Sequence, residues 1–232
     1  MDNRVMEVKL VSYSTPVNLE HNELQNIQDL VAYCARISNP SNQSNTETSE
    51  RLIRYLIKNQ HWSPLEMVSA CLEITTTRDI ARQILRHRSF SFQEFSQRYA
   101  DPLKELTFVL REARLQDPSN RQNSIDFGTT QGDLNIKEEW FHWQEKVIDM
   151  SRQAYTWAVR NGIAKEQARS VLPEGNIQSK LYMNGTLRSW IHYIQLRSAN
   201  GTQKEHMKIA YACAEVISKI FPMSKEFTTK IT

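Results

Sequence analysis

Several short stretches of apolar residues, bounded by polar ones, have the pattern of β-strands. The clearest are residues 6–13 and 67–76, and the stretches 106–110 and 178–183 are shorter candidates. Short apolar runs that are rich in β-branched residues and bounded by polar segments are typical of strands. We therefore predict a strand in each of the four stretches.

Longer stretches have apolar residues at helical spacing. Residues 23–37, 51–60 and 78–87 follow this spacing in the first half of the chain. The segment 38–50 between the first two is dense in serine, asparagine and threonine. Such side chains favour turns and cap helices, so we expect a surface loop that leads into the second helix.

The second half of the chain is expected to be mostly helical. The polar, glycine-containing stretch 117–133 is predicted to be a mobile insertion. An amphipathic pattern over 136–161 then predicts a long helix, and Gly162 stands where a helix C-cap belongs. The side chains that we expect this helix to bury are Trp140, Trp143, Ile148 and Trp157. Shorter helices are expected near 163–170, 187–198 and 203–220.

Together these elements predict the fold class α+β, with a mixed or antiparallel sheet packed against several helices that include a long central one. A chain of 232 residues can bury roughly 70% of the surface that its unfolded state exposes. It needs no disulfide or metal for stability. We expect a single domain over residues 1–232.

Charge and cysteine content narrow the class of protein. The formal net charge is +3, which favours anionic ligands but is well below the clustered basic surface of nucleic-acid binders. Cys34, Cys71 and Cys213 lie far apart in apolar stretches, so we expect buried thiols in a reducing compartment. The cysteines and histidines lack the spacing of a zinc site, so we expect no metal.

The ends and the hydropathy of the chain suggest its location. The opening MDNRVMEVKL carries charges throughout and has no apolar core, unlike a secretory signal. No window approaches the roughly 18 apolar residues that span a bilayer. We expect a soluble, cytoplasmic protein that does not bind a membrane.

The most unusual stretch is RHRSFSFQEFSQRY at residues 86–99, which concentrates arginine, histidine, serine and amide side chains. If the helix over 78–87 forms, Gln83, Arg86 and His87 share one face at its end. If the next residues are extended, Glu94, Ser96 and Arg98 point to one side. The side chains on the other side would then be Phe95, Gln97 and Tyr99.

These residue types suit a nucleotide. Guanidinium groups hold phosphate through paired hydrogen bonds, and a carboxylate accepts from sugar hydroxyls or a base N–H. The alternative is a solvated charged turn without a ligand. The chain has no G-x-G-x-x-G segment and no P-loop, so a dinucleotide would not lie in a Rossmann site.

The order of these residues also matches a known family. R-H-R followed by seven residues and serine, Arg86 to Ser96, resembles the signature of the flavin-dependent thymidylate synthases. HWSPLE at 61–66 and ARQ at 81–83 resemble two upstream motifs of that family, and ARSVLP at 168–173 and TLRSWIHYIQLR at 186–197 resemble two downstream ones. Gln93 departs from the pattern, because many members have asparagine there.

The resemblance implies a homotetramer of α+β subunits with sites at the subunit interfaces. It implies the conversion of dUMP to dTMP, with methylenetetrahydrofolate as carbon donor and FAD, reduced by NADPH, as hydride donor. By motif position, the residues that contact FAD are Ser63, Arg86, His87, Arg88, Glu94, Arg188 and His192, together with His61, Glu66 and Thr186. Those that bind dUMP are Gln83, Arg86, Glu94, Phe95, Ser96, Gln97, Arg98, Arg169 and Arg197.

Arg197, Arg98 and Ser96 are the candidates for the chemistry itself. A guanidinium beside N3 and the oxygens of uracil would favour the ionised ring, which makes C5 nucleophilic, and we assign this role to Arg197. Ser96 is expected to contact the substrate rather than attack it, because no histidine is placed to activate it. Arg188 and Arg197 lie about 180° apart around their predicted helix, at about 100° per residue, so one helix can serve two ligands.

Two alternatives come from other classes of protein. The arginines together with Phe90, Phe92, Phe95 and Tyr99 as stacking platforms would suit a single-stranded nucleic-acid-binding module. A flavoprotein without turnover would share the FAD site. The family resemblance favours the enzyme, with no nucleic acid as partner.

Overall fold

The computed structural model describes residues 6–17 and 24–227. At its centre is a four-stranded antiparallel sheet with the order β1-β2-β6-β3. Its strands are β1 (Glu7–Tyr13), β2 (Ser69–Thr77), β6 (Gln178–Thr186) and β3 (Ser91–Glu94). Buried and more exposed positions alternate along β2 and β6, so these central strands turn one face to the core. The predicted α+β class is confirmed.

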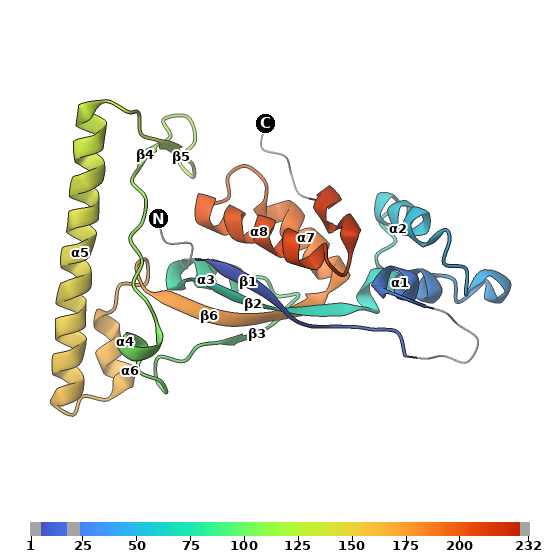
Figure 1. The fold of residues 1–232 in the computed structure, drawn as a ribbon, viewed down its shortest axis with the longest axis horizontal. Helices are drawn as coiled ribbons and strands as arrows, with labels where there is room; N and C mark the ends of the chain where they lie inside the picture. Colours follow the sequence, from blue (N-terminus) through green and yellow to red (C-terminus); the bar gives the residue numbers. More distant parts are fainter. Residues whose placement is uncertain (1–5, 18–23, 228–232) are drawn as a thin grey trace.

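Helices α7 (Leu187–Arg197) and α8 (Lys204–Ile217) lie on one face of this sheet, and α3 (Arg78–Ile84) continues directly from β2 (Figure 1). Their apolar sides meet the buried side chains of the strands in one large cluster. Trp190 of α7 is fully buried, and its indole Nε1 donates a hydrogen bond of 3.0 Å to the carbonyl of Ala70. Burial of this large ring holds α7 on the sheet.

The two ends of the sheet carry different helices (Figure 1). At one end, α1 (Ile27–Ala35) packs against α2 (Ser49–Lys58). At the other end stands the long helix α5 (Gln131–Arg160), which forms a small second cluster with α6 (Lys165–Ala168). The remaining elements are η2 (Pro40–Asn42), η3 (Ser63–Glu66), α4 (Pro102–Glu105), β4 (Arg114–Gln116), β5 (Ser124–Asp126), η4 (Arg169–Val171) and η5 (Pro222–Phe227).

Most predicted elements are present. The strands expected at 6–13, 67–76 and 178–183 are β1, β2 and β6. The strand expected at 106–110 is wrong, because one isolated bridge from Phe108 to Ile177 is the only pairing assigned to it in the described part of the chain. The N–H of Val109 bonds to the carbonyl of Asn176, and the carbonyl of Thr107 accepts from the N–H of Gln178 at the start of β6. Residue 23, the expected start of the first helix, lies outside the described residues, and α1 begins after the N-cap Asn26.

The stretch 117–133 contains ordered elements that the sequence did not predict. Strand β5 pairs with β4 in a hairpin, and Asp126 forms an ion pair of 2.8 Å with Lys204 of α8. Helix α5 begins at Gln131 because Thr130 and Asp133 form a capping box. The N–H of Asp133 donates to the hydroxyl of Thr130, and the N–H of Thr130 donates to the carboxylate of Asp133, both at 3.2 Å. In the described residues, no helix is long and apolar enough to cross a membrane.

Two predictions of burial are wrong in part. Trp140, Trp143 and Trp157 are 43%, 53% and 62% exposed, and of the four core residues expected on α5 only Ile148 is buried. The helix has two neighbouring apolar stripes, and other described residues of the chain cover one of them. Among the cysteines, Cys213 is fully buried, whereas Cys34 and Cys71 are half-buried.

Gly185 on β6 has a close neighbour. A Cβ at this position would lie 2.4 Å from Cδ1 of Phe90, whose ring packs over the strand. Phe90 also packs edge-on against Trp190, with ring centroids 4.8 Å apart. The absence of a side chain at Gly185 therefore allows the turn that ends in Phe90 to lie against the sheet and α7.

We expect Gly185→Ala to lower the free energy of unfolding by about 1–3 kcal/mol, the usual effect of overpacking a core. Urea denaturation followed by circular dichroism would measure the change. Gly175→Ala is the matched control, because an added Cβ there meets nothing within 4 Å. Equal stability of the two variants would show that Phe90 moves aside without strain.

Candidate active site

The turn after α3 carries the RHR segment. The helix ends at Ile84, because the N–H of Arg86 bonds to the carbonyl of Gln83 with the three-residue spacing that tightens a helix end. The prediction of a helix through residue 87 is therefore too long. Arg86 and Arg88 are exposed on the turn, whereas His87 is half-buried.

Arg197, the last residue of α7, reaches this turn. Its Nε donates a hydrogen bond of 2.9 Å to Nε2 of His87. A guanidinium can only donate, so His87 carries its proton on Nδ1. Burial lowers the pKa of His87 to about 4, and the charges of Arg197 and Arg86 add to this effect. His87 is therefore neutral at neutral pH and holds Arg197 as an acceptor.

The site has positive charge without a counter-charge. Within the described residues, no carboxylate forms an ion pair with Arg86, Arg88 or Arg197. Burial lowers the pKa of Arg197; Tyr193 acts against this effect, and the nearby charge of Arg86 adds to it. Guanidinium groups that disfavour each other's charge in this way favour a bound anion.

Two residues that the sequence did not single out complete this cluster. His206 of α8 is fully buried, with Nδ1 at 3.2 Å from Oε1 of Gln83 and Nε2 at 3.2 Å from the hydroxyl of Tyr193. The ring of Tyr193 packs edge-on against His87, with centroids 4.9 Å apart. Tyr193 lies four residues before Arg197, so helical spacing alone could have placed it beside the site.

A second group of predicted residues lies where η3 meets the start of α7. Arg188 forms an ion pair with Glu66. The ring of His192 packs edge-on against Trp62, with centroids 4.6 Å apart, and burial lowers the pKa of His192 with Arg188 adding to the effect. Ser63 is exposed at the first position of η3.

Thr186 and His61 border this group. The hydroxyl of Thr186 accepts from the N–H of Ser189 at 3.3 Å and so caps α7. His61 faces the ring of Tyr55, with centroids 6.1 Å apart. Arg188 and Arg197 contact different elements, as their positions on opposite sides of the helix predict.

A third group follows β3. Oε1 of Glu94 accepts from the hydroxyl of Ser179 at 2.7 Å and lies 3.5 Å from the buried Arg78. Strand β3 ends at Glu94, so the predicted alternation of side chains stops there. Tyr99, which was expected on the side of the strand opposite Glu94, is 88% exposed. Phe95 is half-buried and Ser96 is exposed.

The arginines of this third group meet at one glutamate. Arg98 lies 3.7 Å from the carboxylate of Glu166, and Nε of Arg169 donates to the carbonyl of the same residue at 3.3 Å. Gln97 is 3% exposed, and its Nε2 has no hydrogen-bond partner among the described residues. The family resemblance already named Gln97 as a dUMP-binding residue, but only the structure shows that its amide is buried with an unused donor.

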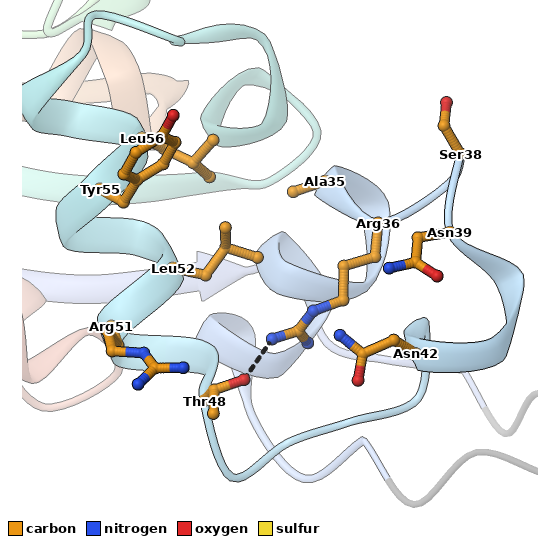
Figure 2. A pocket seen from close by; sticks show the side chains of 10 residues that line it. All are labelled: Ala35, Arg36, Ser38, Asn39, Asn42, Thr48, Arg51, Leu52, Tyr55 and Leu56. Atoms are coloured by element: carbon orange, nitrogen blue, oxygen red, sulfur yellow. Dashed lines mark hydrogen bonds between the residues drawn. The ribbon is translucent and has the colours of Figure 1, made fainter.

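A cavity of about 570 Å³ lies between α1 and α2 (Figure 2). Arg36 lines it and is 8% exposed; its guanidinium donates to the hydroxyl of Thr48 at 2.8 Å and to the carbonyl of Asn45. Burial lowers the pKa of Arg36, and Asp29 opposes this effect. None of the predicted residues lines the cavity, but Tyr55 does, so it adjoins His61 and the second group.

Comparisons with known proteins agree with these motifs. The family model described as thymidylate synthase complementing protein matches residues 19–223. A probable flavin-dependent thymidylate synthase of Paramecium bursaria Chlorella virus 1 is 46% identical over 221 residues, which cover 94% of this chain and 96% of the relative. A flavin-dependent thymidylate synthase of Synechocystis is 46% identical over 218 residues, with the same coverage of 94% and 96%.

A solved structure shares the fold. The UMP/dUMP methylase PolB from Streptomyces cacaoi, bound with 5-Br dUMP, superposes with a TM-score of 0.74 at 24% identity, over 96% of this chain and 93% of that chain. Identity at this level supports the fold alone. The family model and the two relatives extend over nearly the whole sequence. The chain therefore belongs to the flavin-dependent thymidylate synthase family.

Proposed function

We propose that this chain reductively methylates dUMP to dTMP, with methylenetetrahydrofolate as carbon donor and FAD, reduced by NADPH, as hydride donor. The observation that carries the proposal is the 2.9 Å contact between Arg197 and His87. It joins the last arginine of one family motif to the histidine of another, in a site rich in positive charge. The relatives are named flavin-dependent thymidylate synthases, and the PolB structure holds a brominated dUMP.

The donor groups of the chain fit an anionic flavin dinucleotide. Arg86 and Arg88 are exposed without a carboxylate partner among the described residues, and Arg36 is a nearly buried guanidinium that forms no ion pair there, although the charge of Asp29 acts on it. Guanidinium groups that are not paired with a carboxylate favour a bound anion such as the diphosphate of FAD. When bound, the flavin supplies the hydride. The other residues that we propose for this site are His61, Ser63, Glu66, His87, Glu94, Thr186, Arg188 and His192.

The proposed binding of dUMP rests on the cluster around Arg197 and on the third group, which follows β3. Arg98 and Arg169 share Glu166, so each keeps guanidinium donors for a phosphate. Arg197, half-buried and held by a neutral histidine, would favour negative charge on the uracil ring. The residues that we propose to hold dUMP are Gln83, Arg86, Glu94, Phe95, Ser96, Gln97, Arg98, Arg169 and Arg197.

The thiols of the chain favour a mechanism without a cysteine nucleophile. Burial raises the pKa of Cys34, Cys71 and Cys213. Each thiol therefore stays protonated at neutral pH, whereas the thiolate is the nucleophilic form of cysteine. Activation of the pyrimidine would then depend on charge and positioning by the arginines.

We also propose a homotetramer with sites at subunit interfaces, each subunit acting as one domain. On α5, apolar residues recur at alternating intervals of three and four, the spacing of a helix that pairs with another helix. Most of them are large and exposed in the described part of the chain. These residues are Ile136, Trp140, Trp143, Val147, Met150, Ala154 and Trp157.

The experiment that tests the function measures flavin and turnover together. Purified protein is expected to carry the visible absorbance of oxidised flavin. With methylenetetrahydrofolate and NADPH it should release tritium from dUMP labelled at C5 and form dTMP. A colourless protein that binds single-stranded RNA would support the nucleic-acid module instead, and a yellow protein without tritium release would point to an inert flavoprotein.

We expect Arg197→Lys to keep the fold and the flavin but to lose about 10²–10³ in turnover, the effect of removing one preorganised electrostatic donor. Lysine keeps the charge but not the planar fork of donors. Turnover at saturating dUMP, with flavin absorbance as the measure of loading, checks the result. Arg54→Lys, an exposed arginine that pairs with Glu50 and Glu226, is the matched control. Near-normal turnover of Arg197→Lys would reduce Arg197 to a binding or capping role.

We expect Val147→Lys combined with Met150→Lys to dissociate the tetramer and to abolish turnover with it. The two residues are 48% and 65% exposed in the subunit, so new charges there should not unfold it. Sedimentation velocity would measure the assembly. Glu145→Lys places the same charge on another side of α5 and should leave the tetramer intact. A fully active monomer would contradict the proposal of shared sites.

A further inference from the structure

A continuous chain of hydrogen bonds runs from α7 through the end of α3 to the start of α8. The hydroxyl of Tyr193 lies 3.2 Å from Nε2 of His206, and Nδ1 of His206 lies 3.2 Å from Oε1 of Gln83. Nε2 of Gln83 donates to Oε1 of Gln203 at 2.7 Å. Nε2 of Gln203 donates to Oε2 of Glu205 at 3.0 Å.

Glu205, at the end of this series of hydrogen bonds, determines the direction of every other bond in the series. Burial alone would raise the pKa of Glu205, but the hydrogen bond from Arg114 and the charges of Arg111 and Arg114 bring it below its ordinary value. Glu205 is therefore ionised and can only accept. Arg114 binds it at 2.7 Å, and Arg111 lies 3.3 Å away.

Starting from the carboxylate of Glu205, only one orientation is possible for each amide and only one tautomer for His206. Gln203 must turn its NH₂ group to Glu205, which leaves its oxygen for Gln83. Gln83 must then turn its NH₂ group to Gln203 and its oxygen to His206. An oxygen there requires a proton on Nδ1 of His206, so the other ring nitrogen accepts from the Tyr193 hydroxyl.

The groups at the other end have the protonation states that this direction requires. Burial lowers the pKa of His206 to about 3, with Arg197 and His87 adding to the effect, so the ring is neutral. Burial raises the pKa of Tyr193 well above its ordinary value, so its hydroxyl keeps the proton that it donates. If any one of these hydrogen bonds ran in the opposite direction, two donors or two acceptors would face each other elsewhere in the series.

We propose that Glu205, Gln203 and His206 are positioning residues that orient the amide of Gln83, so that its NH₂ group faces Gln203 and presents its second N–H to an oxygen of the substrate. The inference rests on the proposed function, in which Gln83 contacts dUMP. Among the described residues, His206 uses one lone pair of the Gln83 oxygen and Gln203 uses one N–H of the NH₂ group, which leaves the second N–H for a ligand. Gln83 is half-buried, so a ligand can reach that N–H.

A neutron crystal structure of the full-length, deuterium-exchanged protein tests the direction of the chain without any measurement of activity. We expect a deuteron on Nδ1 of His206 and the NH₂ group of Gln83 facing Gln203. A deuteron on Nε2 of His206, or the oxygen of Gln83 facing Gln203, would overturn the proposal.

A pair of variants tests the effect on the substrate. His206→Asn keeps a donor near the position of Nδ1, whereas His206→Gln moves its amide beyond that position. We expect the KM for dUMP to rise about 5–10-fold in His206→Gln and to stay within about 2-fold in His206→Asn, with kcat little changed in both, as for one lost hydrogen bond. At this fully buried position Asn leaves more empty volume than Gln, so a purely structural role would impair His206→Asn more than His206→Gln, the reverse of the expected order.

A double-mutant cycle with Gln83→Ala shows whether His206 acts through Gln83. In that background His206→Gln should not change the KM for dUMP further; an additive effect would contradict the proposal. Wild-type tritium release is measured first. If it is absent, the proposed function fails, and the neutron structure still decides the direction of the chain. If it is present but the two His206 variants behave alike, only the positioning role fails.

Discussion

The contact between Gly185 and the ring of Phe90 is the constraint on which the site depends. The ring occupies the space of the missing side chain, 2.4 Å from where a Cβ would lie. Phe90 ends the turn that begins with Arg86, and its own N–H bonds to the carbonyl of His87 at 3.3 Å. The turn is held to α7 by a second contact, the hydroxyl of Ser189 donating to the carbonyl of Ser89 at 3.1 Å. A larger residue on β6 would displace the whole turn from α7.

The register of the sheet brings the rest of the site to this turn. Strands β2 and β6 pair antiparallel, with Ser69 opposite Thr186 and Thr77 opposite Gln178. Helix α3 follows β2 and α7 follows β6 without an intervening loop, so the two helices start at opposite ends of the paired strands. Helices that start in this way run toward each other over the sheet. His87, in the turn after α3, and Arg197, at the end of α7, therefore meet although they are 110 positions apart in sequence.

How much of this could be predicted from the sequence depends on whether the signal is local. Strand and helix patterns depend on neighbouring residues, and they located β1, β2, β6 and most helices to within about five residues, but not the short helix α4. The family motifs named the residues around His87 and Arg197, but their spacing could not show that His206 and Gln203 orient Gln83 across 120 or more positions. The prediction that the tryptophans of α5 are buried was wrong for a different reason. Periodicity shows that a helix has an apolar stripe, and it does not show whether the covering surface belongs to the same subunit.

The cluster around Arg197 explains why two histidines are buried among arginines. Burial disfavours the charged form of both rings and the charge of Arg197 adds to this effect, so the pKa values of His87 and His206 fall to about 4 and about 3. Neutral rings can accept from an arginine or a tyrosine and keep those side chains in place. An anion that enters such a site meets donors already oriented toward it, and this preorganisation favours developing negative charge more strongly than water can.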